Sequence, residues 1–249
     1  MESLAIAASA AVASLGGVAA YGAAWPRSQI FGRTIYSTNS PRKLALTFDD
    51  GPNPAITPQL LKLLEQHHAR ATFFVIGKFV RDNPALAREI VAAGHIIGNH
   101  TETHPNLFWC GKNETREQLG RCNEAVFVAT GNTPRWFRPP YGFRSPWLSG
   151  VAREFRLSTI MWTRIPGDWH AKPAEWLIRR TQTIADRAQR NLKNPSARGD
   201  ILCLHDGNHA FQNGDRTITL ATLQYWLPRW RDLGLKFVTI EEAIQTPGD

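Results

Sequence analysis

The chain has 249 residues, of which 43% are hydrophobic and 20% charged, and its formal net charge is +8. This composition is typical of a folded globular protein and excludes a disordered, collagen-like or low-complexity chain. The positive charge favours an anionic partner, but no nucleic-acid-binding motif accompanies it, so we expect no nucleic acid partner. Three cysteines are too few for a disulfide scaffold; whether Cys110 and Cys122 pair stays open.

The first predicted element is an apolar segment at residues 1–25, with no charged side chain between Ser3 and Trp25. Its length suits a membrane-spanning helix or the core of a signal peptide. However, no basic residue precedes it, and Arg27 and Arg33 lie on the flank that the positive-inside rule disfavours. Three interpretations stay open: an anchor, a signal, or a helix packed on the protein body. The first two predict a membrane-associated or exported protein of the cell envelope, whereas the third allows a cytoplasmic one.

From residue 40 onward, short apolar segments typical of strands alternate with longer helical patterns. We predict strands at residues 43–48, 71–76, 95–99, 136–138, 158–162, 200–204 and 236–239. Helices are predicted between them at residues 57–68, 83–93, 113–129, 146–155, 173–193 and 217–233. This alternation predicts an α/β fold with parallel strands joined by right-handed crossovers. Seven strands without a linker predict one domain at residues 40–249, a closed or nearly closed β/α barrel whose site lies at the C-terminal strand ends.

Carboxylate and imidazole side chains follow the first and third of these strands. Asp49 and Asp50 come directly after the first strand, where we expect a turn that points both carboxylates into one site. His100 and His104 follow the third strand and would share one face if this stretch were helical. Two imidazoles and a carboxylate with open positions are typical of a catalytic rather than a structural metal site. Taken singly, each pair also fits an ordinary polar turn or unliganded histidines.

Three further strand ends carry polar side chains. Arg138 ends the fourth strand and is followed by a rigid proline turn, and Asp168 and Trp169 come shortly after the fifth. His205 ends the sixth strand, and its side-chain type suits a general acid near neutral pH. Each residue also has a purely structural explanation, as a salt bridge for Arg138, a core aromatic for Trp169 or a satisfied strand-end histidine for His205.

In this order, the five segments resemble the five motifs of the polysaccharide deacetylase family, carbohydrate esterase family 4. The resemblance covers about residues 43 to 245 and implies a distorted seven-stranded (β/α) barrel. It also implies a metal-dependent hydrolase that removes N-acetyl groups from carbohydrates containing N-acetylglucosamine, such as chitooligosaccharides or the glycan of peptidoglycan. The matching segments are Thr47–Pro52, His100–His104, Arg138–Gly142, Asp168–Trp169 and Leu202–His205.

The resemblance implies roles for individual residues around a metal site. Asp50, His100 and His104 would bind one divalent metal ion, for which zinc is expected and cobalt or nickel are alternatives. Asp49 would act as the general base that takes a proton from the attacking water. Arg138 would orient Asp49 and favour its ionised form.

The same resemblance implies the remaining catalytic and substrate-binding residues. The backbone N–H of Tyr141 would help to form an oxyanion hole. His205 would protonate the leaving amine, with Asp168 as its charged partner. The substrate pocket around the acetyl group would be shaped by Trp169, Leu202 and Pro139.

Two features depart from the family pattern or extend it. Arg164 stands in a run where many relatives carry acidic or small polar residues, which leaves substrate preference open. His209 adds a polar group beyond the last motif, where it would contact sugar hydroxyls or stabilise a loop.

Two alternative functions stay open beside deacetylation of a glycan. One is a deformylase or deacylase of a lipid-linked amino sugar, which the apolar N-terminus, the basic charge and a possible association with the membrane surface would suit. The other is a non-catalytic carbohydrate-binding relative, although every expected catalytic position is filled. In each case the expected partner is a carbohydrate with an N-acylated amino sugar.

Overall fold

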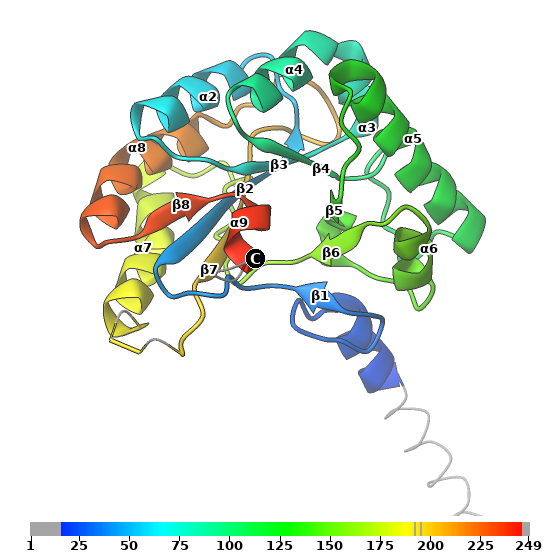
Figure 1. The fold of residues 1–249 in the computed structure, drawn as a ribbon, viewed down its shortest axis with the longest axis horizontal. Coiled ribbons are helices and arrows are strands. Elements are labelled where there is room, and N and C mark those ends of the chain that lie inside the picture. Colours follow the sequence, from blue (N-terminus) through cyan, green and yellow to red (C-terminus); the bar gives the residue numbers. More distant parts are fainter. Residues whose placement is uncertain (1–15, 192, 195, 246–249) are drawn as a thin grey trace, which may run out of the picture.

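A sheet of eight strands, curved into an incomplete barrel, forms the centre of the computed structural model (Figure 1), which describes residues 16–191, 193–194 and 196–245. The seven predicted strands are all present, and every ladder between the strands is parallel. One additional strand, β1, has only two residues and therefore no alternation that a sequence could display. The strands are β1 Thr34–Ile35, β2 Lys43–Gly51, β3 Thr72–Val75, β4 Ile96–Asn99, β5 Trp136–Phe137, β6 Ser158–Ile160, β7 Asp200–His205 and β8 Lys236–Val238.

The sheet runs in the order β1-β6-β5-β4-β3-β2-β7, and β8 also pairs with β2. β8 lies against Lys43–Ala45 and β3 against Thr47–Gly51, so the two share one edge of β2. The gap between the ends of this order is bridged by single contacts rather than a ladder. Arg164, in the segment after β6, pairs with Leu202 of β7, and its carbonyl accepts a 2.9 Å hydrogen bond from the backbone of Cys203. This irregular closure explains why the barrel is distorted.

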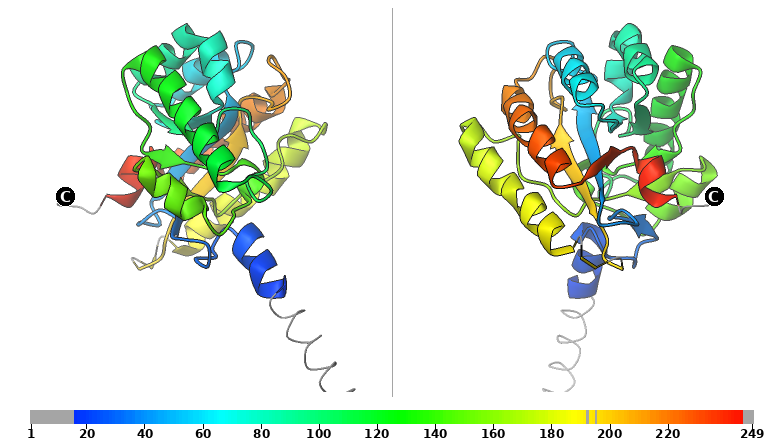
Figure 2. Two further views of the ribbon diagram at one scale, coloured as in Figure 1. Left: turned by 90° about the vertical axis from the view of Figure 1, so that its right-hand side faces the viewer. Right: turned by 60° about the vertical axis from the view of Figure 1, so that its left-hand side comes forward.

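Most helices cover the outside of the sheet (Figures 1 and 2), and all six predicted helices are present. The last helix, Ile240–Ile244, packs instead on the inner face, where Ile240 and Ala243 lie in one cluster with Ala45. Two short helices, α3 and α9, were not predicted because six and five residues are too few to show helical periodicity. The helices are α2 Thr57–Gln66, α3 Gly77–Asp82, α4 Pro84–Ala92, α5 Lys112–Thr130, α6 Leu148–Glu154, α7 Ala174–Asn191, α8 Thr217–Asp232 and α9 Ile240–Ile244, with a 3₁₀ turn at Pro140–Gly142 and a further helical stretch at residues 16–24.

The alternation of side chains along β2 separates the core from the site. Leu44, Leu46 and Phe48 belong to the main hydrophobic cluster, which includes side chains of the outer helices. Ala45 belongs to a second cluster on the other face of the sheet. Because side chains two apart share a face of a strand, Asp49 lies on the inner face with Ala45. The fold therefore turns the first carboxylate toward the barrel interior.

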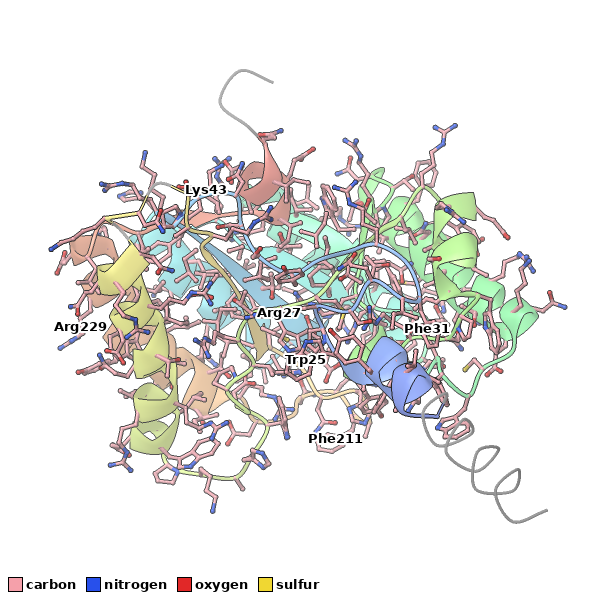
Figure 3. All side chains as sticks on the ribbon, turned by 90° about the horizontal axis from the view of Figure 1, so that it is seen from below. Trp25, Arg27, Phe31, Lys43, Phe211 and Arg229 are labelled. Carbon is pink, nitrogen blue, oxygen red and sulfur yellow. The ribbon has the colours of Figure 1, made fainter. Side chains whose placement is uncertain are left out.

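Arg144 binds the N-terminal segment to the rest of the protein by hydrogen bonds. The buried guanidinium of Arg144 donates hydrogen bonds to the carbonyls of Trp25 (2.5 Å) and Ser28 (2.8 Å). Figure 3 shows Trp25 beside the N-terminal helix, whose Val18 and Tyr21 are exposed. Most of the predicted apolar segment, residues 1–15, lies outside the described residues. Among the residues described, no helix combines the length and the apolar character needed to cross a membrane. All three cysteines are buried free thiols.

Candidate active site

The carboxylates of Asp49 and Asp50 line one cavity, although the two residues are neighbours in a strand. We predicted a turn after the strand, but both residues lie within β2. Side chains of adjacent strand residues normally point to opposite faces. Asp50 breaks this rule because its φ of 71° is left-handed and the pairing with β3 shifts register between Asp49 and Gly51. This β-bulge brings both acids to the same cavity.

His100 and His104 meet in an irregular loop, so the helical case considered from their spacing does not apply. Thr101 and His104 have positive φ values of 68° and 62°, which fold the chain back on itself. The side-chain oxygen of Asn99 accepts from the N–H of Thr101 at 2.8 Å, and the hydroxyl of Thr101 accepts from the N–H of His104 at 3.0 Å. The two rings lie 4.8 Å apart, centroid to centroid. Local hydrogen bonds rather than helical geometry therefore bring the imidazoles together.

Asp50, His100 and His104 form a group that fits a divalent metal ion. Their ligand atoms all lie within 4.8 Å of one another. The Nδ1–H of His100 donates to the carbonyl of Arg138 at 2.7 Å, which leaves the lone pair of Nε2 directed at the site. Oδ1 of Asp50 lies 3.5 Å from Nε2 of His100 and 3.2 Å from Nε2 of His104, yet it is buried without a hydrogen-bond partner. A cation would satisfy this unpartnered oxygen.

The protonation states of the group agree with metal binding. Burial, together with the neighbouring His100, lowers the pKa of His104 to about 3, so its ring is neutral and able to coordinate. Burial alone would raise the pKa of Asp50, but His100 and His209 hold it well below its usual range. One ionised carboxylate and neutral imidazole nitrogen are ligands that zinc prefers.

Asp49, Cys203 and His205 form a second group of potential ligands at similar distances. Burial and the nearby Asp49 raise the pKa of Cys203 well above its usual value, so the thiol stays protonated and is a poor metal ligand. Oδ1 of Asp49 is occupied by Arg138 at 2.7 Å, and Nδ1 of His205 by Asp168 at 2.8 Å. The first group is therefore the better metal site.

Arg138 holds Asp49 in place from beneath the cavity. Its guanidinium is fully buried and donates to Oδ1 of Asp49 at 2.7 Å and to the hydroxyl of Thr47 at 2.8 Å. Its carbon Cζ lies 4.2 Å from the ring centroid of Phe74, which packs against the guanidinium plane. The second oxygen of Asp49 stays directed toward the site, 3.8 Å from Nε2 of His100. This geometry suits a base next to the metal site.

His205 lies across the cavity and is supported by a buried carboxylate. Asp168 accepts hydrogen bonds from the backbone N–H of His205 (2.7 Å), from its Nδ1 (2.8 Å) and from the hydroxyl of Thr219 (2.8 Å). Burial alone would lower the pKa of His205, but Asp168, with smaller contributions from Asp50 and Asp49, raises it to about 9. His205 is therefore protonated at neutral pH and can donate a proton from Nε2.

The residues around these groups enclose a cavity of about 500 Å³. Pro139, Tyr141 and Trp169 are among the residues that line it, and the ring of Trp169 meets that of His205 edge-on with centroids 5.2 Å apart. Leu202, which we expected beside the acetyl group, is not among its lining residues and instead lines the adjacent cavity that shares Trp162 and Ile165. Side chains alternate along β7, and Leu202 packs in the main core cluster while Cys203 lies beside Asp49.

His209 contacts the metal site more closely than the sequence indicated. Its ring stacks on that of His104 with centroids 4.5 Å apart, and its Nδ1 lies 3.7 Å from Oδ2 of Asp50. Its Nε2 lies 3.2 Å from the hydroxyl of Tyr141. From the sequence, His209 was only a polar residue four positions after His205. Its contacts depend on how the loop after β7 folds over the site, which no sequence pattern indicates.

A buried carboxylate and an imidazolium thus lie on either side of three potential metal ligands, an arrangement that fits a metal-dependent hydrolase. The polysaccharide deacetylase family model matches residues 36–160. The chain is 36% identical over 210 residues to a peptidoglycan-N-acetylglucosamine deacetylase of Bacillus cereus, covering 83% of this chain and 90% of that protein. It is 36% identical over 195 residues to a chitooligosaccharide deacetylase of Sinorhizobium fredii, covering 76% and 86% respectively.

The fold is similar to that of solved structures as well. The crystal structure of the Bc1960 peptidoglycan N-acetylglucosamine deacetylase superposes with a TM-score of 0.74 at 28% identity, covering 87% of this chain and 94% of that one. The chain thus belongs to the polysaccharide deacetylase family, and it is a metal-dependent hydrolase of that class.

Proposed function

We propose that this protein hydrolyses the N-acetyl group of N-acetylglucosamine units in a glycan, either peptidoglycan or a chitooligosaccharide. The observation that carries the proposal is the convergence of two ion-paired groups on one cavity. Asp49 with Arg138 lies on one side of the metal-binding group, and His205 with Asp168 on the other. The names of the relatives support N-acetylglucosamine as the sugar. None of the relatives described above is named for a lipid-linked substrate, so that alternative has no support.

The residues of this chain divide the work of amide hydrolysis. A divalent ion at Asp50, His100 and His104, for which we propose zinc, would polarise the amide carbonyl and acidify the attacking water when bound. Asp49 takes the proton of that water as its oxygen attacks the carbonyl carbon, and Arg138 keeps the carboxylate oriented.

The remaining steps complete the hydrolysis. The backbone N–H of Tyr141 donates to the oxygen that becomes negative as the tetrahedral intermediate forms. The imidazolium of His205 then gives its Nε2 proton to the departing nitrogen as the C–N bond breaks. The products are acetate and a free amino sugar. The proton held by Asp49 leaves to solvent, and His205 takes up a proton from solvent, which restores both groups.

The rim of the cavity suits a sugar ring. Tyr141 and Trp169 line the cavity and yet are 52% and 45% exposed, so their rings are accessible to a ligand. Aromatic side chains that are half-buried present an apolar face to C–H groups and a polar edge to hydroxyls. We therefore assign them to holding the sugar that carries the reacting acetamide.

Acetate release tests the proposal directly. The zinc-loaded protein is expected to release acetate from chitotetraose or from purified peptidoglycan, and the Asp49→Asn variant is expected to lose at least 100-fold in kcat, within the range of roughly 10²–10⁴ typical of general base catalysis. Asp232→Asn is a matched control, because it makes the same substitution at an exposed position at the end of α8. No acetate from either substrate, or equal activity of the Asp49→Asn variant, would overturn the proposal.

We also propose that the protein works in the cell envelope, where peptidoglycan lies. The exposed Val18, Tyr21, Trp25 and Ile30 support this location because aromatic and aliphatic side chains favour a membrane interface. Fractionation of cells expressing the full chain should recover it with the envelope. Recovery in the cytosolic fraction alone would contradict this location without affecting the chemistry.

A further inference from the structure

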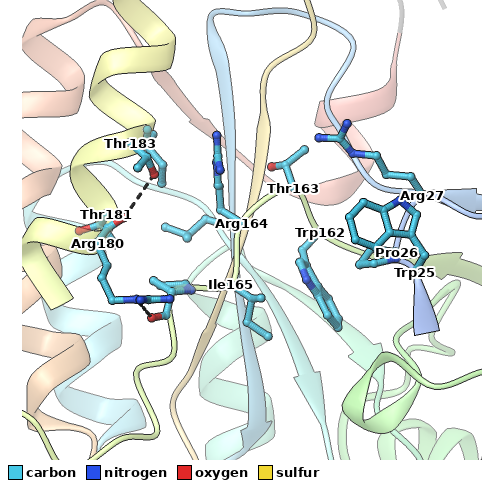
Figure 4. Close-up of a pocket in the computed structure, with 13 residues that line it drawn as sticks. Trp25, Pro26, Arg27, Trp162, Thr163, Arg164, Ile165, Arg180, Thr181 and Thr183 are labelled. Carbon is cyan, nitrogen blue, oxygen red and sulfur yellow. Dashed lines mark hydrogen bonds between the residues drawn. The ribbon is translucent and has the colours of Figure 1, made fainter. Parts of the chain in front are cut away.

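A second cavity, of about 590 Å³, lies next to the catalytic one, and Trp162 and Ile165 line both. We call it the arginine cavity. Its walls come from residues 25–27 after the N-terminal helix, residues 162–166 after β6, four residues of α7 and one of β7: Arg180, Thr181, Thr183, Ile184 and Leu202. Figure 4 shows Arg164 between Arg27 on one side and Arg180 of α7 on the other. A cavity of this volume is within the usual range for a ligand site.

The lining of the arginine cavity is positively charged and lacks a carboxylate. Arg27, Arg164 and Arg180 contribute to its walls, and none of the 13 lining residues is acidic. Within the part of the chain that the structure describes, none of these three arginines forms an ion pair with a carboxylate, whereas seven arginines elsewhere do. Three guanidinium groups without a carboxylate partner create a local positive potential that attracts an anion.

Two of the three arginines are held in place by neighbouring groups. Nε of Arg180 donates to the carbonyl of Pro166 at 2.5 Å, and its guanidinium lies over the ring of Trp176 with 4.9 Å between Cζ and the centroid. The backbone of Arg164 is hydrogen-bonded to β7 on both sides, at 3.2 Å to Ile201 and 2.9 Å to Cys203. The guanidinium of Arg180 and the backbone of Arg164 are thus held in place at the cavity.

The side chain of Arg164 contains a hydrogen-bond donor that a ligand would satisfy. Its Nε is buried and has no hydrogen-bond partner among the described residues. A buried donor without a partner costs free energy because it has lost its water. An anionic acceptor that entered the cavity would offset this cost, and a guanidinium can bind a carboxylate with two parallel hydrogen bonds.

We propose that the arginine cavity binds a carboxylate carried by the same glycan whose acetamide enters the catalytic cavity. Trp162 and Ile165 line both cavities, so the two are adjacent and neighbouring sugars of one chain would reach both. The tryptophan rings of Trp25 and Trp162 offer apolar surface to the sugar between. The enzyme then prefers an acidic glycan, such as one bearing lactyl carboxylates, to a neutral one. This inference rests on the proposed function.

Three substrates of similar length separate the effect of charge from that of size. The first is a tetrasaccharide of alternating N-acetylglucosamine and N-acetylmuramic acid, the second is the same molecule with its carboxylates converted to primary amides, and the third is chitotetraose. For the wild-type protein, kcat/KM is expected to be about ten-fold higher for the acidic molecule than for its amide, as one charge-assisted hydrogen bond would give. In the Arg164→Gln variant, this preference should fall below about two-fold, through KM rather than kcat.

Matched controls keep the outcome specific. Arg190→Gln removes the same charge from an exposed position on α7 and should leave the preference unchanged. Arg27→Gln provides a second lesion in the cavity if Arg164→Gln fails to fold. Activity of Arg190→Gln on chitotetraose should change less than about two-fold. In Arg164→Gln and Arg27→Gln the loss on the acidic tetrasaccharide should exceed the loss on chitotetraose, because a guanidinium binds a carboxylate more strongly than a neutral hydroxyl.

The failure of this inference is distinguishable from failure of the proposed function. Equal kcat/KM for the acidic and amidated molecules, or an equal loss in Arg190→Gln and Arg164→Gln, overturns the arginine cavity while deacetylation stands. If no substrate releases acetate, the proposed function fails. Calorimetric binding of the acidic tetrasaccharide to the Asp49→Asn protein, with and without Arg164→Gln, then still tests the cavity, and equal affinities refute it.

Discussion

Replacing Asp168 by asparagine tests the acid half of the site. The Asp168 carboxylate accepts three hydrogen bonds, two of them from His205, and it is the main group that raises the pKa of His205 to about 9. A shift of that size from the ordinary value of 6.5 corresponds to about 3 kcal/mol in favour of the imidazolium form. Asparagine keeps the shape but removes the charge, so burial alone would act and the pKa would fall to the ordinary value or lower.

The consequence appears in the alkaline limb of activity. A group with a pKa near 9 is about 90% protonated at pH 8, whereas one with a pKa of 6.5 is about 3% protonated. The general acid of the Asp168→Asn variant is thus depleted at least about 30-fold at pH 8. We expect kcat/KM of the wild type to fall as pH rises through 9, and that of the variant to fall more than two pH units earlier.

The assay is a profile of kcat/KM from pH 5.5 to 10, together with NMR titration of the His205 ring. Thr219→Val is the matched control. It removes the hydrogen bond that Oδ2 of Asp168 accepts from the hydroxyl of Thr219 but leaves the charge of the carboxylate. Its alkaline limb should move by less than about one unit. An alkaline limb that stays near pH 9 in Asp168→Asn would refute the assignment of His205 as the acid.

Three other predictions follow from contacts of named side chains. His209→Ala should weaken zinc binding about 10- to 100-fold by calorimetry, because His209 packs against two of the metal ligands; unchanged affinity would contradict this role. Arg138→Met should lower the free energy of unfolding by about 3–5 kcal/mol in urea, since it leaves the buried Asp49 without its partner; a loss below 1 kcal/mol would be unexpected. Burial lowers the pKa of His95 to about 4, and its Nδ1 accepts from the N–H of Ala71, so the folded state favours the neutral ring and stability falls as pH drops below 6.5. His95 alone should contribute a loss of about 2 kcal/mol between pH 7.5 and 5, so the loss in His95→Gln should be smaller than that of the wild type by about this amount; equal losses in the two proteins would contradict it.

The strand order and the site were predictable to the extent that they depend on periodicity. Strands that alternate with helices form a parallel sheet, and polar residues at their carboxyl ends then converge. Asp49, His100, Arg138 and His205 could be placed together on that basis, and the structure brings them to one cavity or directly beneath it. β1 was missed because two extended residues in an irregular segment carry no pattern.

What could not be predicted depends on local backbone geometry. The two carboxylates share a cavity only because Asp50 adopts a left-handed conformation, and no residue spacing reveals this. The side of the sheet on which Leu202 lies could not be predicted, because β7 is apolar on both faces, which hides the alternation of a buried parallel strand. The contact of Cys203 with Asp49 depends on the same unrecognised alternation along β7. The approach of His209 to Asp50 depends on the conformation of the loop after β7.

The central claim is that one cation held by Asp50, His100 and His104 is required for deacetylation. Titration of metal-free protein with zinc, while acetate release is followed, tests it most directly. We predict activity that rises from near zero and saturates at one zinc per chain, and no rise in the Asp50→Asn variant. Full activity of the metal-free protein, or equal activation of the Asp50→Asn variant, would contradict the account.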